Sequence, residues 1–101
     1  MKSPLPQQAY QLNAEVYKLL ANPKRLEILN LLREQELSVE ELIKVLRLPK
    51  VNVSQHLTIL RQAQLVTVRR NGLSAYYNIS DPRIVEPCRI LHQMRQRNNN
   101  F

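Results

Sequence analysis

The sequence contains few of the residues from which enzymes and metal centres are built. Its 101 residues include one cysteine, Cys88, two histidines and no tryptophan. A lone cysteine cannot form a disulfide within the chain, and two histidines leave little material for a metal site or for a nucleophile with its base. We therefore expect no catalytic site, no metal site and no cofactor.

Long apolar runs are also missing. No stretch approaches the ~20 apolar residues that span a bilayer, and residues 1–4 lack the apolar segment of a secretory signal. We therefore expect a cytoplasmic protein that is not inserted in a membrane. A length of 101 residues with 44% hydrophobic residues fits a single domain, residues 1–101, with one core of its own.

Acidic residues are absent from one part of the chain. The whole sequence has 15 Lys and Arg against 8 Asp and Glu, a net charge of +7. Residues 47–80 contain no acid, and their basic residues are Arg47, Lys50, Arg61, Arg69 and Arg70. A domain this basic usually has a polyanion as its partner. The segregation predicts that the polyanion binds at residues 47–80.

Apolar residues at helical spacing predict four helices in the first two thirds of the chain. The first covers residues 8–20, where Tyr10 and Tyr17 extend the apolar stripe as packing residues. The second starts at the cap Asn22–Pro23 and is central to the core. Ser38 and Glu41 form the capping box of a short third helix.

The fourth helix covers residues 50–64 and buries Val53, Leu57 and Leu60. Because a short turn around Pro49 separates it from the third helix, the two form a helix-turn-helix candidate.

Strand-like composition replaces the helical pattern after the fourth helix. Residues 65–70 and 75–79 are rich in β-branched and aromatic residues, and Asn71-Gly72 between them holds the only glycine of the chain, which predicts a β-hairpin. Asp81-Pro82 then starts a last amphipathic helix, in which Pro87 predicts a kink or a delayed start. The order of four helices, two strands and a helix predicts a mainly α fold with a small β-hairpin, the winged helix-turn-helix.

The acid-free region supplies the candidate DNA contacts. The fourth helix has a width that a major groove admits, and its outward face carries amide side chains that can pair with an adenine edge and bases that can reach phosphate. The candidate DNA-binding residues are Lys50, Val51, Asn52, Ser54, Gln55, Thr58 and Arg61 on this helix and Arg69, Arg70 and Asn71 at the hairpin tip. The alternative interpretation is a solvated helix face whose basic residues only keep the protein in solution.

Several motifs along the chain resemble one family. They include ANPKRLEIL at residues 21–29, LSVEEL at 37–42 and VSQHL at 53–57, and the likeness covers roughly residues 8–95 with the motif order kept. Together they resemble the ArsR-type (ArsR/SmtB) family of winged-helix repressors. The resemblance implies a dimeric prokaryotic repressor whose first and last helices form the dimer interface. The residues expected there are Leu12, Val16, Leu19, Ile84, Cys88 and Leu91.

The sequence departs from the members of this family that sense metals or oxidants. A cysteine pair in the third helix is missing, and on the last helix Asp81 and His92 offer one acid and one imidazole where more ligands would be needed. Asn30 stands where redox-sensing members have a second cysteine. We therefore expect a member that lacks the usual metal-site cysteines, and the sequence names neither a small-molecule nor a redox effector.

These observations predict a homodimeric repressor that binds double-stranded DNA at an inverted repeat. Two other functions stay open, a nonspecific architectural DNA binder and a winged helix used for protein interaction. Activation instead of repression also stays open, as do the operator and the regulated genes. Cys88 is interpreted as a small core or dimer-interface residue, with a disulfide between two copies as the alternative.

Overall fold

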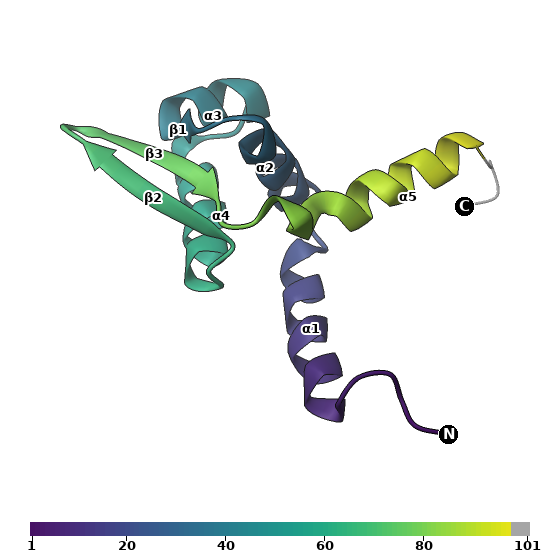
Figure 1. Cartoon of the computed structure of the whole chain (residues 1–101). Helices are drawn as coiled ribbons and strands as arrows, with labels where there is room; N and C mark the ends of the chain where they lie inside the picture. Colours follow the sequence, from purple (N-terminus) through teal and green to yellow (C-terminus); the bar gives the residue numbers. More distant parts are fainter. Residues whose placement is uncertain (98–101) are drawn as a thin grey trace.

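A computed structural model of the protein describes residues 1–97 and confirms the mainly α fold with a small sheet (Figure 1). Residues 98–101 of the expected domain lie outside the described residues. The elements, in chain order, are α1 (Gln7–Leu20), α2 (Pro23–Glu34), β1 (Leu37–Ser38), α3 (Val39–Leu46), α4 (Lys50–Gln62), β2 (Val66–Asn71), β3 (Ser74–Ile79), the 3₁₀ helix η1 (Pro82–Val85) and α5 (Glu86–Arg97).

The helix starts predicted at Asn22 and Ser38 are confirmed. The Asn22 side-chain oxygen accepts hydrogen bonds from the backbone N–H groups of Lys24 (3.0 Å) and Arg25 (3.1 Å). At the start of α3 the Glu41 N–H donates to the Ser38 hydroxyl (3.1 Å) and the Ser38 N–H donates to the Glu41 carboxylate (2.9 Å). Both ends satisfy N–H groups that have no partner within the helix.

The recognition-helix candidate α4 ends two residues earlier than expected, at Gln62. Gln64 adopts a left-handed conformation with φ 62°, and its N–H donates to the Arg61 carbonyl while that of Leu65 donates to the Leu60 carbonyl. These two bonds form a Schellman motif, which usually has glycine at the left-handed position. A glutamine there explains why the helix end gave no signal in the sequence.

The hairpin is confirmed, and each of its strands reaches one residue further toward the turn than expected. Asn71 pairs with Ser74, so the two-residue loop is Gly72-Leu73. Gly72 has φ +65° and Leu73 is not among the residues with positive φ, the pattern of a type II′ turn in which glycine takes the first central position. A third strand, β1, was not expected; it pairs antiparallel with β3 and gives the sheet order β1-β3-β2.

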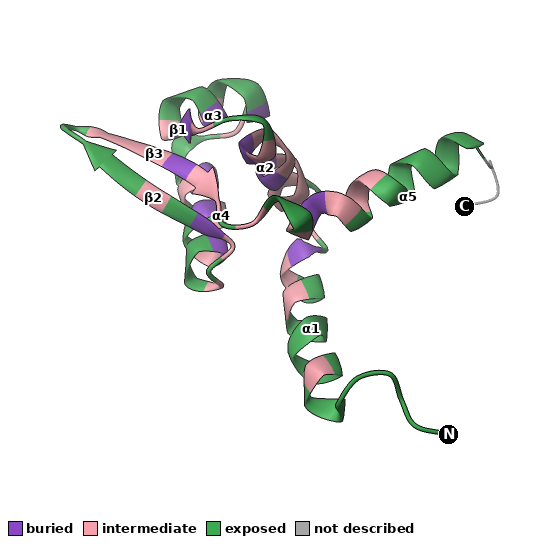
Figure 2. Ribbon diagram, viewed as in Figure 1, coloured by how far each residue is buried: buried purple, intermediate pink, exposed green. Residues whose placement is uncertain are grey.

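The core lies between α2, α3, α4 and the inner face of the sheet (Figure 2). Three residues of α2 are buried, which confirms its central position, and Val53, Leu57 and Leu60 of α4 are buried as predicted. The buried hydrophobic residues are Leu20, Ile28, Leu29, Leu32, Leu37, Leu42, Leu46, Val53, Leu57, Leu60, Val66, Tyr77 and Val85.

The first and last helices project from this core (Figure 1). The predicted delayed start of the last helix is confirmed, because Asp81 caps η1 and α5 begins only at Glu86, beside Pro87. Tyr10 and Tyr17 were expected to pack, but both are exposed, since α1 buries only Leu20. No helix within residues 1–97 is long and apolar enough to cross a membrane.

Candidate nucleic-acid interface

The outer face of α4 is open to solvent and polar. With Val53, Leu57 and Leu60 turned inward, the opposite side of the helix carries the exposed residues Val51, Asn52, Gln55 and Thr58. Lys50 and Arg61 are exposed on the flanks of this face, and Ser54 is half-buried. The Thr58 hydroxyl donates to the Ser54 carbonyl (2.9 Å), and the hydroxyl oxygen of Thr58 can still accept a hydrogen bond. Within residues 1–97 the side chains of Asn52 and Gln55 have no hydrogen-bond partner, so their amides are available to a ligand.

A groove separates the start of α4 from the hairpin. We call it the wing groove, and its lining residues are Val39, Glu40, Lys50, Ser54, Arg70, Leu73, Ala75 and Tyr77. It therefore brings together Lys50 and Ser54 from α4 and Arg70 from β2, three of the predicted DNA contacts. Neither Lys50 nor Arg70 forms an ion pair within residues 1–97. Two positive side chains without an ion-pair partner thus line one groove.

The two neighbouring arginines of the hairpin point to opposite faces of the sheet. Side chains alternate along a strand, and the register pairs Arg69 with Tyr76 and Arg70 with Ala75. Arg70 shares its face with the core residues Val66 and Tyr77, and this is the face toward α4. Arg69 lies on the outer face, away from the wing groove. The sequence had predicted that both arginines contact DNA from the hairpin tip.

Arg69 is held by a carboxylate from the connection between α2 and β1. Its Nε and one terminal nitrogen donate to the two oxygens of Glu36 (3.1 and 2.7 Å), and its guanidinium lies 4.8 Å from the centre of the Tyr76 ring. The Asn78 amide also donates to Glu36 (2.7 Å). The hydrogen bonds from Arg69 and Asn78 lower the pKa of the Glu36 carboxyl to about 2.

This cluster fastens β1, β3 and β2 to one another on the outer face. Leu37 pairs with Tyr77, so Glu36 sits beside Asn78, and Arg69 must reach across β3 to meet it. No signal in the sequence indicated a role for Glu36, because no local pattern links it to Arg69, 33 positions later. Only the pairing of β1 with β3, itself unexpected, brings the two side chains together.

His56 braces α4 against the preceding helices. The Arg25 guanidinium lies 3.5 Å from His56 Nδ1, and Arg25 Nε donates to the Leu19 carbonyl at the end of α1 (2.7 Å). Burial, followed by the nearby Arg25 charge, lowers the pKa of His56. The position of His56 therefore favours a bracing role over a base contact.

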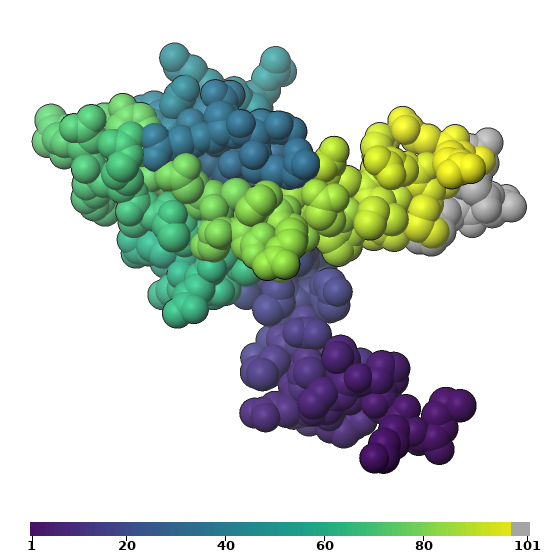
Figure 3. Space-filling model, in the orientation of Figure 1, coloured from purple at the N-terminus to yellow at the C-terminus, as the bar shows by residue number. Residues whose placement is uncertain are grey.

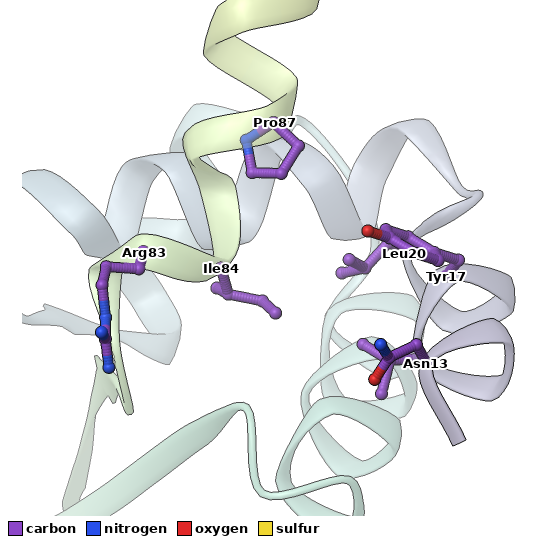
Figure 4. A pocket seen from close by; sticks show the side chains of 7 residues that line it. Asn13, Tyr17, Leu20, Arg83, Ile84 and Pro87 are labelled. Atoms are coloured by element: carbon purple, nitrogen blue, oxygen red, sulfur yellow. The ribbon is translucent and has the colours of Figure 1, made fainter. Parts of the chain in front are cut away.

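A second surface is formed by the two projecting helices (Figure 3). Among the residues expected at the dimer interface, Leu12 and Leu91 are exposed, and Val16, Leu19, Ile84 and Cys88 are half-buried. Figure 4 shows Ile84 and Pro87 facing Asn13, Tyr17 and Leu20 of α1 across a hollow of about 230 Å³. A further hollow, more apolar, adds Leu26, Cys88 and Leu91 to this surface.

Cys88 lies on this surface beside α2. Its sulfur is 3.8 Å from the Asn30 amide nitrogen, and it is half-buried among apolar neighbours. Residues 1–97 contain no group of three or more His, Cys, Asp or Glu side chains placed to hold a metal ion.

Comparison with known proteins agrees with the fold. Residues 22–68 match the family described as "Bacterial regulatory protein, arsR family". The chain is 40% identical over 89 residues to the helix-turn-helix regulator Rv0081 of Mycobacterium tuberculosis, covering 87% of this chain and 78% of the relative. It is 36% identical over 84 residues to the transcriptional repressor PagR of Bacillus anthracis, covering 82% and 84%.

Solved structures give the same result. The crystal structure of Rv0081 superposes with a TM-score of 0.76 at 38% identity, covering 95% of this chain and 93% of that one. A solution structure from Mycobacterium bovis, described as a homodimeric winged helix-turn-helix DNA-binding domain, has a TM-score of 0.80 at 27% identity, covering 100% and 98%. These relatives are regulators and not enzymes, as expected for this sequence. The chain is a winged helix-turn-helix transcriptional regulator and belongs to the ArsR family of bacterial regulatory proteins.

Proposed function

We propose that the protein is a homodimeric repressor that binds an inverted-repeat operator with α4 in the major groove. The observation that carries this proposal is the outer face of α4, which is exposed, rich in amide and hydroxyl side chains and free of acidic residues. The protein would act in the cytoplasm, where bacterial DNA lies.

Base recognition would come from the middle of α4. Asn52 and Gln55 can each donate and accept at an adenine edge, and Ser54 and Thr58 can add single hydrogen bonds. Val51, exposed at 62%, offers an apolar contact to a thymine methyl group. These contacts specify sequence, because the pattern of donors and acceptors in the major groove differs among base pairs.

Phosphate binding would come from both ends of α4 and from the hairpin. Lys50 and Arg70 face the wing groove and Arg61 is exposed in the last turn of α4. We propose that Arg70 and Asn71 contact the DNA backbone, and that Arg69 acts differently, by holding the hairpin through Glu36. The space between a recognition helix and its wing is where one DNA strand would pass, so Lys50 and Arg70 would bind it from two sides.

A second copy would cover the face formed by α1 and α5. Support comes from the apolar side chains that these helices leave exposed, including Leu12, Tyr17 and Ile90, because monomeric proteins rarely expose large contiguous apolar patches. The Mycobacterium bovis relative is homodimeric. Two copies related by a two-fold axis would read half-sites about one helical turn, roughly 34 Å, apart.

The first experiment is selection of genomic fragments by the purified protein at physiological salt, followed by sequencing of the retained DNA. Enrichment of one inverted repeat is the expected outcome. Uniform retention of all fragments would indicate an architectural binder, and no retention would leave a protein-interaction module, so either result would overturn the proposal. Expression of a reporter fused to the enriched site separates repression from activation.

Gln55→Ala tests base recognition directly. The variant should lose affinity for the operator by about 1–3 kcal/mol per lost base contact while its affinity for a scrambled duplex stays the same. Binding titrations with both duplexes measure the difference. An equal change for both duplexes would remove Gln55 from base recognition.

A further inference from the structure

The wing groove is lined by one acidic side chain as well as by its two positive charges. Glu40 is exposed in the first turn of α3 and lines the groove together with Lys50, Ser54 and Arg70. It is the one acid among the groove's lining residues.

Glu40 is also unusual among the acids of the chain. Six of the eight Asp and Glu residues have a hydrogen bond or an ion pair, namely Glu27, Glu34, Glu36, Glu41, Asp81 and Glu86. Within residues 1–97 the two without a partner are Glu15, on α1, and Glu40. The nearby cations therefore do not neutralise Glu40 by direct contact, and its charge acts on whatever enters the groove.

A phosphate in the groove would meet both attraction and repulsion. Lys50 and Arg70 attract it, and the Glu40 carboxylate repels it. Two unit charges ~5 Å apart in water interact by ~0.8 kcal/mol, which corresponds to about a fourfold change in affinity. Because every duplex carries the same phosphates, this repulsion does not depend on the base sequence.

We propose that Glu40 is an opposing charge in a phosphate-binding groove and weakens the protein's binding to DNA of any sequence. This inference rests on the proposed function, since it requires that a DNA strand passes between α4 and the hairpin. Lys50 and Arg70 raise the affinity of the wing groove for DNA, and Glu40 lowers it. The affinity of the regulator for DNA then depends more on the base contacts of α4.

The same position has a simpler explanation that predicts a different result. An acid in the first turn of a helix stabilises the helix by interacting with its positive end. If that were its whole effect, Glu40→Gln would lower the stability of the protein slightly and leave DNA affinity unchanged.

The test compares Glu40→Gln with Glu15→Gln, which removes the same charge from an exposed and unpartnered acid on α1. Dissociation constants are measured for the selected operator and for a scrambled duplex at several salt concentrations. Thermal unfolding and sedimentation verify that both variants fold and assemble like the parent. Glu40→Gln should bind both duplexes about fourfold more tightly at low salt, with the gain shrinking at higher salt because ions screen the repulsion. Glu15→Gln should match the parent. Glu40→Lys should bind more tightly still.

Two outcomes would overturn the inference while leaving the proposed function intact. In the first, Glu40→Gln changes affinity no more than Glu15→Gln does, which would mean that the carboxylate lies away from the DNA path. In the second, Glu40→Gln weakens binding to the operator alone, which would make Glu40 a base-reading residue. A failure of the proposed function is recognised separately, because the parent protein would then not prefer its selected operator over the scrambled duplex.

Discussion

The opposite orientations of Arg69 and Arg70 lead to a sharp prediction about salt dependence. Arg70 faces the wing groove without an ion-pair partner within residues 1–97, whereas Arg69 is bound to Glu36 on the other face of the hairpin. Arg70→Ala should therefore remove a phosphate contact, and Arg69→Ala should remove a contact within the protein. Both substitutions delete the same positive charge from neighbouring positions, so each is the control of the other.

The expected size follows from counterion release. Each phosphate that a protein neutralises contributes about 0.9 to the slope of log affinity against log salt concentration. If Arg70 neutralises one phosphate, Arg70→Ala should flatten this slope by about 0.9, and Arg69→Ala should leave the slope within error of the parent. Between 50 and 200 mM salt, the parent would then lose about 3.5-fold more affinity than Arg70→Ala loses.

The assay is a fluorescence-anisotropy titration of a labelled duplex at four or more salt concentrations. A scrambled duplex is sufficient, because phosphate contacts do not depend on sequence. Equal slopes for Arg70→Ala and the parent would refute the phosphate role of Arg70. A flattened slope for Arg69→Ala would show that Arg69 leaves Glu36 when DNA binds.

Further predictions concern stability and assembly. Ser38→Ala removes the cap of α3 and should cost about 1 kcal/mol of unfolding free energy, measured by urea denaturation. The lowered pKa of Glu36, about 2 against an ordinary 4.5, means that its ion pair stabilises the fold above about pH 4.5 and loses this effect as pH falls toward 2. The unfolding free energy of Glu36→Gln should therefore fall less than that of the parent over that window, measured by urea denaturation at each pH. An equal fall in both proteins would contradict this. Leu12→Asp should shift sedimentation toward the monomer and weaken operator binding, whereas Val45→Asp, an exposed apolar position on α3, should do neither.

Local signals in the sequence were sufficient for the helices, the hairpin and the position of the candidate DNA surface. The caps at Asn22 and Ser38 are formed by side chains within three residues of their partners, so composition alone reveals them. Burial of Val53, Leu57 and Leu60 follows from helical spacing, and it fixes which side of α4 faces outward. The single glycine marked the hairpin because φ is positive there.

Features that depend on distant residues were not predictable in this way. The strand β1 has two residues, too few for a pattern, and Ser38 serves both as its last residue and as the cap of α3. The partner of Arg69 is Glu36, which only this pairing brings within reach. The left-handed conformations of Gln64 after α4 and of Arg47 after α3 were also hidden, because neither position carries the glycine that usually marks such a conformation.

The separation of the core from the projecting helices has a consequence for how the regulator responds to its own concentration. Within residues 1–97 all buried hydrophobic residues lie between Leu20 and Val85, so the part of the molecule that carries α4 is packed entirely within one chain. Separation of two copies would then leave each DNA-reading unit folded, and assembly would be a reversible equilibrium of folded subunits. Occupancy of a two-fold operator would rise with the square of subunit concentration wherever monomers predominate. A modest change in the rate of synthesis of the protein would then cause a larger change in operator occupancy.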